Sequence, residues 1–243
     1  GWRNPWPVGK PVIDIVAEPI QHGMHASSLL LEGDVGAILD RLGDDLTAKP
    51  VWAEGEPAAV RHAFRAAFAT PRDWGPHAVF ETLRAIAPAG TVATADSGAH
   101  RILLSQMWGC DGARTLLQSS GLCTMGCALP LATGAALGSR RPTLCFVGDA
   151  GLEMVLGELA TLRDLHLPVI VVVLVDRALG LIALKQRQLG LARAGVDIGE
   201  TDFAAVARAM GGHGVTIEDR GTLAREAEAA FRRDGFTLLA CRI

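Results

Sequence analysis

The sequence lacks a long hydrophobic run, a basic cluster and a signal-type leader, and each absence excludes a class of protein. The apolar run over residues 168–175 is far too short to cross a bilayer, and no charged, then apolar, leader opens the chain. The 23 basic residues are scattered and the net charge is only −3, so nothing indicates a nucleic acid partner. We therefore expect a cytoplasmic protein that binds neither nucleic acid nor a membrane.

The cysteines form an odd set without Cys-x-x-Cys spacing or a nearby histidine. They stand at positions Cys110, Cys123, Cys127, Cys145 and Cys241. This pattern disfavours a zinc site and favours buried, reduced thiols, as is usual in the cytoplasm. The sequence also lacks repeats and low-complexity segments. No expected helix begins with Gly-x-Gly-x-x-Gly, and the absence of this motif disfavours a plain nicotinamide-binding fold.

What the chain has is the composition of a folded protein, with 49% apolar and 20% charged residues in a length of 243. From residue 75 onward strands and helices alternate, which predicts an α/β domain with a doubly wound parallel sheet and helices on both faces. We expect strands at 91–95, 143–147, 169–175 and 237–241, and helices at 125–138, 153–166, 179–188, 202–210 and 222–233.

The N-terminal part predicts much less structure. A strand at 11–17 and a helix at 33–42 cannot close a core of their own, so we expect residues 1–48 to be the remnant of an α/β domain. Residues 49–74 are expected to be a linker with a helix at 57–69, and residues 75–243 the main domain. The chain opens without Met, and we expect it to be a piece of a longer protein or one subunit of a two-chain enzyme.

Two acidic residues follow expected strands and carry the first functional hypothesis. Asp149 follows the strand at 143–147 and Asp176 follows the strand at 169–175. They are 27 positions apart, which suits one crossover between nearby parallel strands. A carboxylate pair at one sheet edge serves either acid/base catalysis or a hard cation. The small residues Gly148, Ala150 and Gly151 beside a helix N-terminus favour phosphate and Mg²⁺.

Four blocks of sequence resemble the thiamine-diphosphate-dependent enzymes, in particular the acetolactate-synthase-like group. They are Gly-Asp-Ala-Gly at 148–151, Val-Asp-Arg at 175–177, Gly-Leu-Cys-Thr-Met-Gly at 121–126 and Gly-Ala-His at 98–100. The resemblance covers nearly the whole chain. It implies that residues 11–42 end a central domain and that residues 75–243 form the diphosphate-binding domain.

Carried over to this sequence, the resemblance implies a set of site residues. The Mg²⁺ ligands would be the carboxylates of Asp149 and Asp176 and the carbonyl of Ala178. Met125 would support the bent cofactor, and the Cys123 carbonyl would accept a hydrogen bond from its 4′-amino group, so both are expected to assist catalysis. The other expected cofactor contacts are Gly98, Ala99, His100, Gly148, Ala150, Gly151, Leu179 and Gly180.

Plainer interpretations of some of these residues stay open. Met125 could pack in a core, and His100 could make only a local hydrogen bond. Lys185, Arg187 and Arg193 could meet a carboxylate substrate, but a solvated helix face also explains them.

Three positions refine or weaken the resemblance. Ala150 replaces the usual glycine, which is tolerable if its backbone is not left-handed, and Asp176 replaces the usual asparagine. At Ile182 the decarboxylases that release aldehydes carry a glutamate, so an aliphatic residue favours ligation of two carbonyl compounds.

The resemblance implies an enzyme that decarboxylates a 2-oxo acid such as pyruvate and passes the acyl group to an acceptor carbonyl. The alternatives are a decarboxylase that releases an aldehyde and a non-catalytic cofactor-binding subunit. A pyrimidine-binding domain, usually on another subunit of a homodimer or homotetramer, is not found here, so the chain alone is expected to be inactive. Some relatives also carry FAD in the central domain, and the sequence leaves that open.

Overall fold

The computed structural model describes residues 10–18, 27–44, 46–47, 51–52, 54–68 and 73–243. The chain divides into two compact units, residues 1–58 and residues 59–243. Each unit is described by itself.

The first unit holds a two-stranded parallel sheet and one helix. Strand β1 (Ile13–Val16) pairs with β2 (Leu29–Glu32), and β2 is a strand that the sequence analysis missed. Helix α1 (Val35–Gly43) begins after Asp34, whose side chain accepts a hydrogen bond from the Ala37 amide at 2.8 Å. No residue of α1 is buried, so the described part of this unit does not enclose a core.

A helix, α2 (Glu56–Ala67), lies where the linker helix is expected and crosses the boundary between the units. The proposed division at residues 48 and 74 stays a prediction.

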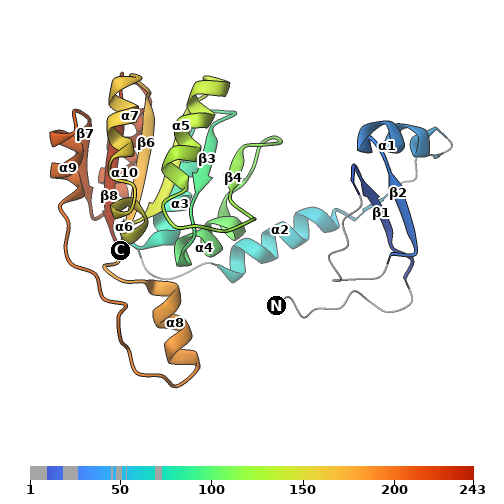
Figure 1. Ribbon diagram of the computed structural model, residues 1–243, viewed down its shortest axis with the longest axis horizontal. Helices are drawn as coiled ribbons and strands as arrows, with labels where there is room; N and C mark the ends of the chain where they lie inside the picture. The colour runs from blue at the N-terminus through green and yellow to red at the C-terminus, as the bar shows by residue number, and fades with distance from the viewer. Residues whose placement is uncertain (1–9, 19–26, 45, 48–50, 53, 69–72) are drawn as a thin grey trace. The chain divides into compact units, whose positions relative to one another are not determined.

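The second unit is built on a six-stranded, fully parallel sheet (Figure 1), which confirms the predicted fold class. Its strands are β3 (Val92–Ala95), β4 (Leu116–Gln118), β5 (Thr143–Gly148), β6 (Val169–Val175), β7 (His213–Ile217) and β8 (Thr237–Arg242). Their order across the sheet is β4-β3-β5-β6-β8-β7. Strands β5 and β6 are therefore direct neighbours, with Gly148 opposite Leu174.

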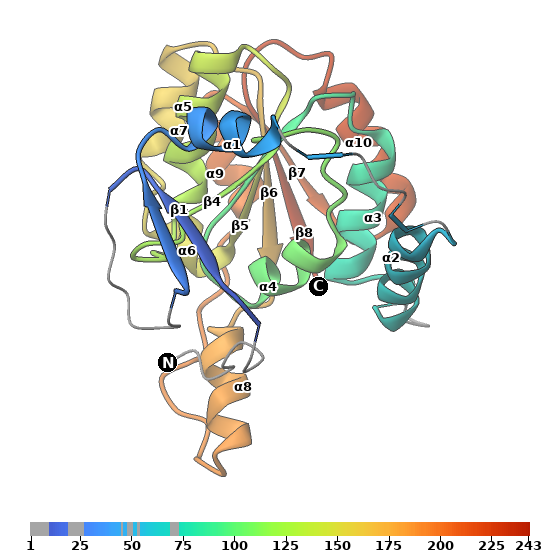
Figure 2. The ribbon, with the colours of Figure 1, turned by 90° about the vertical axis from the view of Figure 1, so that its right-hand side faces the viewer.

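Helices cover both faces of this sheet (Figure 2). On one face lie α3 (Pro76–Ile86), α4 (Ala99–Met107) and α10 (Arg220–Ala230), and on the other lie α5 (Ala128–Ser139), α6 (Asp149–Glu153), α7 (Glu158–Asp164) and α9 (Phe203–Ala209). The buried strand β6 divides its side chains between the two cores: Ile170 and Val172 join the first, and Val171 and Val173 join the second.

Several expected elements differ from those observed. The helix expected at 125–138 begins only at Ala128, because Gly126 has φ +78° and interrupts a right-handed helix. The helix expected at 153–166 begins only at Glu158, as α7, because residue 153 ends the short helix α6 and residues 154–157 form a turn. Helix α4 and the three-residue strand β4 had no counterpart in the analysis of the sequence.

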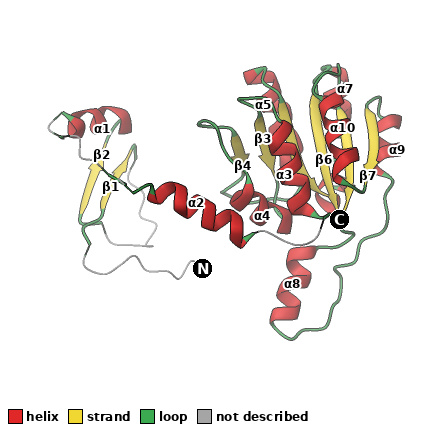
Figure 3. Ribbon diagram, turned by 180° about the vertical axis from the view of Figure 1, so that it is seen from behind, coloured by secondary structure: helices red, strands yellow, loops and turns green. Residues whose placement is uncertain are grey.

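Helix α8 (Gly180–Gln188) lies beyond the carboxyl ends of the strands and buries none of its residues (Figure 3). Within the described ranges, no helix is long and apolar enough to cross a membrane.

The expectation of buried thiols is only partly correct. Cys145 and Cys241 are buried, Cys123 and Cys127 are half-buried, and Cys110 is exposed. Cys110 is exposed because it lies in the loop after α4, outside the two cores.

Candidate functional site

The two strand-end carboxylates lie on neighbouring strands, as the spacing predicts. Asp149 directly follows β5 and Asp176 directly follows β6. In a parallel sheet the carboxyl ends of adjacent strands meet at one edge, which is where ligands of open α/β sheets bind.

Asp149 is almost completely buried, with 4% of its surface exposed. Its Oδ1 accepts a hydrogen bond from the Ala150 amide at 2.8 Å, and its Oδ2 accepts one from the Arg177 amide at 2.7 Å. The second bond ties β5 to the segment that leaves β6. Burial raises the pKa of Asp149 despite these two bonds, which act in the opposite direction.

Asp176 is an exposed residue whose carboxyl is bonded to the backbone that follows it. Its Oδ1 accepts a hydrogen bond from the Ala178 amide at 3.1 Å. Desolvation of the carboxyl, and then the charge of Asp149, raise the pKa of Asp176. Each carboxylate charge disfavours the other, and a cation bound between the two would relieve this repulsion.

The segment around Ala178 is held by a short antiparallel bridge with residue 197. The Leu179 amide donates to the Val196 carbonyl at 2.8 Å, and the Ile198 amide donates to the Arg177 carbonyl at 3.0 Å. These bonds fix the backbone that carries the third expected metal ligand.

A cavity of about 380 Å³ opens at this edge of the sheet and brings the predicted residues together. Its wall includes Gly98, Ala99, His100, Met125, Gly148, Asp149, Ala150, Gly151, Asp176, Ala178, Leu179, Gly180 and Ile182. Apart from Cys123, every residue predicted from the resemblance is on this wall. Cys123 has φ +50°, and its thiol donates to the Ser119 carbonyl at 3.3 Å.

The structure bears on two further expectations: that the backbone at Ala150 is not left-handed, and that cationic side chains lie near the site. Ala150 does not have a positive φ, so its methyl group fits the conformation of the turn. Arg187 and Arg193 line a second cavity, of about 680 Å³, that shares Asp176 with the first. Arg193 also pairs with Asp197, so part of its charge is already compensated, whereas Lys185 is on neither wall.

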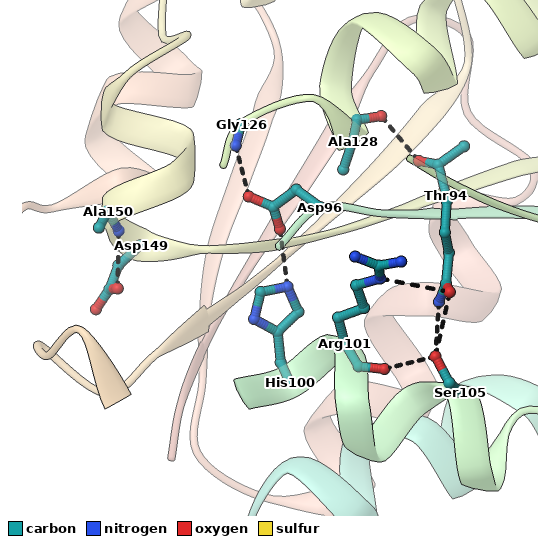
Figure 4. Close-up of polar contacts among 10 residues, drawn as sticks. Thr94, Asp96, His100, Arg101, Ser105, Gly126, Ala128, Asp149 and Ala150 are labelled. Carbon is teal, nitrogen blue, oxygen red and sulfur yellow. Dashed lines mark hydrogen bonds and ion pairs between the residues drawn. The ribbon is translucent and has the colours of Figure 1, made fainter. Parts of the chain in front are cut away.

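One buried group at the site, Asp96, is not among the residues predicted from the sequence. It directly follows β3, and its carboxylate binds His100 Nε2 at 2.8 Å and accepts a hydrogen bond from the Gly126 amide at 2.6 Å (Figure 4). Its position after a strand is the same signal that singled out Asp149 and Asp176.

The donor set fits the group that the resemblance implies. Two carboxylates and a backbone carbonyl are hard oxygen ligands, of the kind that Mg²⁺ combines with phosphate oxygens and water. The wall beside them includes small residues and the start of α6, and the start of a helix is a position that favours an anion. Among the described residues no group of three or more His, Cys, Asp or Glu side chains could hold a metal, so any metal here must share its shell with backbone and ligand oxygens.

This arrangement defines a class of protein: a doubly wound α/β domain with a cavity lined by strand-end carboxylates and a helix start. Residues 96–241 match the family model described as "Thiamine pyrophosphate enzyme, C-terminal TPP binding domain". The chain belongs to this family of thiamine-pyrophosphate enzymes.

Curated relatives point to the same family. The chain is 30% identical to the acetolactate synthase large subunit of Parasynechococcus marenigrum (strain WH8102), over 94% of this chain and 38% of that protein. It is also 30% identical to the probable 2-ketoarginine decarboxylase AruI of Pseudomonas aeruginosa, over 99% of this chain and 44% of that protein. The acetolactate synthase isozyme 3 large subunit of Escherichia coli (strain K12) is 33% identical over 58% of this chain and 25% of its own length. The chain thus spans less than half the length of each of these relatives.

Proposed function

We propose that the chain is the diphosphate-binding portion of an enzyme that uses thiamine diphosphate and Mg²⁺ to decarboxylate a 2-oxo acid and ligate the acyl group to an acceptor carbonyl. The observation that carries the proposal is the pair Asp149 and Asp176 on neighbouring strands, facing one cavity whose wall also holds Met125 and His100. The similarity to acetolactate synthase large subunits supports the reaction class.

In this proposal the residues divide into two groups by what they bind. Asp149, Asp176 and the Ala178 carbonyl hold Mg²⁺, which neutralises the diphosphate. The Gly151 amide and the ring of His100 would bind the diphosphate oxygens, and the Ala150 amide would join them by giving up its bond to Asp149 Oδ1. These contacts fix one end of the cofactor, so that its reactive ring lies in a constant place relative to substrate.

The second group faces the reacting end. Met125 would support the bound cofactor, and Ile182 is an apolar residue on the wall of the same cavity. When bound, thiamine diphosphate supplies the electron sink for loss of CO₂ from a 2-oxo acid. An apolar wall offers no proton donor at this point, which favours attack on a second carbonyl over simple protonation.

A decarboxylase that releases an aldehyde is the second candidate, because one relative is named a probable 2-ketoarginine decarboxylase. Product analysis separates the two. The intact enzyme, meaning this chain with the pyrimidine-binding part that we propose it works with, is incubated with pyruvate, thiamine diphosphate and Mg²⁺. Acetolactate supports the ligase, whereas acetaldehyde as the main product supports the decarboxylase.

A non-catalytic cofactor-binding subunit is the third candidate, because Ala150 and Asp176 depart from the family pattern. Product formation by the unmodified intact enzyme separates this candidate from the enzymes, and Asp176→Ala tests the metal site. If the proposal holds, Mg²⁺-dependent thiamine diphosphate binding and turnover are both lost, as measured by calorimetric titration and product formation. A variant that binds and behaves like the unmodified protein would contradict the proposed metal site.

The remaining parts of the proposal concern partners. We propose that the pyrimidine-binding domain comes from another subunit of a homodimer or homotetramer, and that this chain alone does not turn over. Adding back a separately produced pyrimidine-binding part should restore activity. FAD content is decided by the absorption spectrum of the intact enzyme.

A further inference from the structure

We propose that Asp96 is a positioning residue of the cofactor site, and that it acts by joining three cavity-lining segments through one buried carboxylate. The inference rests on the proposed function, because it assigns a role in binding and using the same cofactor. Asp96 itself is not on the cavity wall, and its side chain is 0% exposed.

The first two segments are joined by the two oxygens of the carboxylate. Oδ1 binds Nε2 of His100, in the first turn of α4, at 2.8 Å, and Oδ2 accepts a hydrogen bond from the Gly126 amide at 2.6 Å (Figure 4). His100 lines the cavity from one side, and Met125, next to Gly126, lines it as well. Bonds to a buried carboxylate are short and strong, so they fix both segments relative to β3.

The third segment is the turn from β5 into α6. A Cβ on Gly151 would lie 2.2 Å from Asp96 Oδ2, so the backbone of this turn packs directly against the carboxylate. The same turn approaches the second segment closely, because a Cβ on Gly126 would lie 2.8 Å from the Gly151 carbonyl oxygen. Three segments that are distant in sequence thus meet at one side chain.

The position of His100 depends on this arrangement and on Gly98. A Cβ on Gly98 would lie 2.6 Å from Cε1 of the imidazole, so the ring occupies space that only glycine leaves free. The ring is almost buried, with 8% of the side chain exposed. Removal of the Asp96 carboxylate would leave it without the partner that holds it against the cavity wall.

The experiment compares Asp96→Ala and Asp96→Asn with Thr94→Val in the intact enzyme. Thr94 is a matched control: it lies on β3, which Asp96 directly follows, and it is 0% exposed. Its hydroxyl donates to the Ala128 carbonyl at 2.8 Å, but it does not line the cavity. Each variant is measured for its melting temperature, its Kd for thiamine diphosphate at saturating Mg²⁺, and its kcat at saturating cofactor.

We expect Asp96→Ala to raise the Kd on the order of 10- to 100-fold, the size that follows from losing hydrogen bonds to a charged group. Its kcat should also fall, because Met125 and His100 are no longer fixed. Asp96→Asn keeps an oxygen acceptor for Gly126 and should lie between Asp96→Ala and the unmodified enzyme. Thr94→Val should lower the melting temperature and leave Kd and kcat within about twofold of the unmodified enzyme.

A purely structural role would lower the melting temperature of the Asp96 variants but leave the Kd and kcat of the folded enzyme unchanged, and this result overturns the inference. If Asp96→Ala does not fold, Asp96→Asn alone decides the question by the same two constants. An unmodified enzyme that does not bind thiamine diphosphate overturns the proposed function and this inference with it.

Discussion

The close approach of Gly151 to Asp96 allows a quantitative prediction about Gly151→Ala. The new Cβ would lie 2.2 Å from Asp96 Oδ2 and 3.2 Å from the Gly126 nitrogen, whereas ordinary contact begins at 3.4 Å. The carboxylate and the methyl group must therefore separate by roughly 1.2 Å. Asp96 cannot move that far and keep its bonds to His100 and Gly126.

The cost of Gly151→Ala follows from these two effects. Loss of one bond to the buried carboxylate costs about 1–3 kcal/mol, and strain from the added methyl group costs about 1–3 kcal/mol. We expect a loss of about 2–6 kcal/mol in the free energy of unfolding, which corresponds to a fall of about 4–24 °C in Tm for a chain of this size. Differential scanning calorimetry of the chain without ligands measures it.

Gly134→Ala is the matched control. Gly134 lies within α5, and a Cβ there meets no atom within 4 Å, so we expect a gain of about 0.5–1 kcal/mol from the higher helix propensity of alanine. In the double variant Asp96→Ala with Gly151→Ala, the closest contact is gone and the two costs should not add. A Tm for Gly151→Ala as high as that of the unmodified chain would refute the packing described for the three segments.

Three further outcomes are expected. Burial raises the pKa of Asp149 and Asp176 in the metal-free chain, so their contribution to folding stability is fully present below about pH 4 and is lost as pH rises through the raised pKa values. Mg²⁺ should therefore raise the Tm more at neutral pH than at about pH 4. An equal rise at both pH values would argue against carboxylate ligands. Cys110 should react first with a thiol reagent, whereas Cys145 and Cys241, whose pKa is raised by burial, should react only on unfolding. Peptide mapping after timed labelling measures the order of reaction, and early labelling of Cys145 would contradict its burial. In the intact enzyme Ile182→Glu should shift the products of pyruvate from ligation toward aldehyde by on the order of tenfold or more, and an unchanged product ratio would exclude control by this wall.

The main features of the second unit could be predicted from the sequence because they depend on local pattern. The strand at 169–175 is apolar throughout, which identifies a buried parallel strand, and the spacing of Asp149 and Asp176 corresponds to one crossover between neighbours. Shorter elements gave no such signal. Strand β4 has three residues, all half-buried, and in β2 three of the four residues are exposed, so neither shows the alternation that marks a strand.

Element boundaries depended on backbone geometry that residue types reveal only in part. Small, apolar residues continue from Met125 into α5, and the pattern predicts one helix, but the positive φ of Gly126 separates them. The consequence concerns function, because Met125 is in a loop and not on a helix. A loop residue is positioned by what its neighbours bind, and here the neighbour binds Asp96.

Asp96, Asp149 and Asp176 show why the sequence alone could not distinguish the roles of these acids. Each follows one of three adjacent parallel strands, β3, β5 and β6, at the same edge of the sheet. Asp149 and Asp176 line the cavity, so they are available to a cation. Asp96 is closed off by His100 and Gly126, of which Gly126 lies 30 positions away in the sequence, so only the folded chain determines that this carboxylate serves the protein and not the ligand.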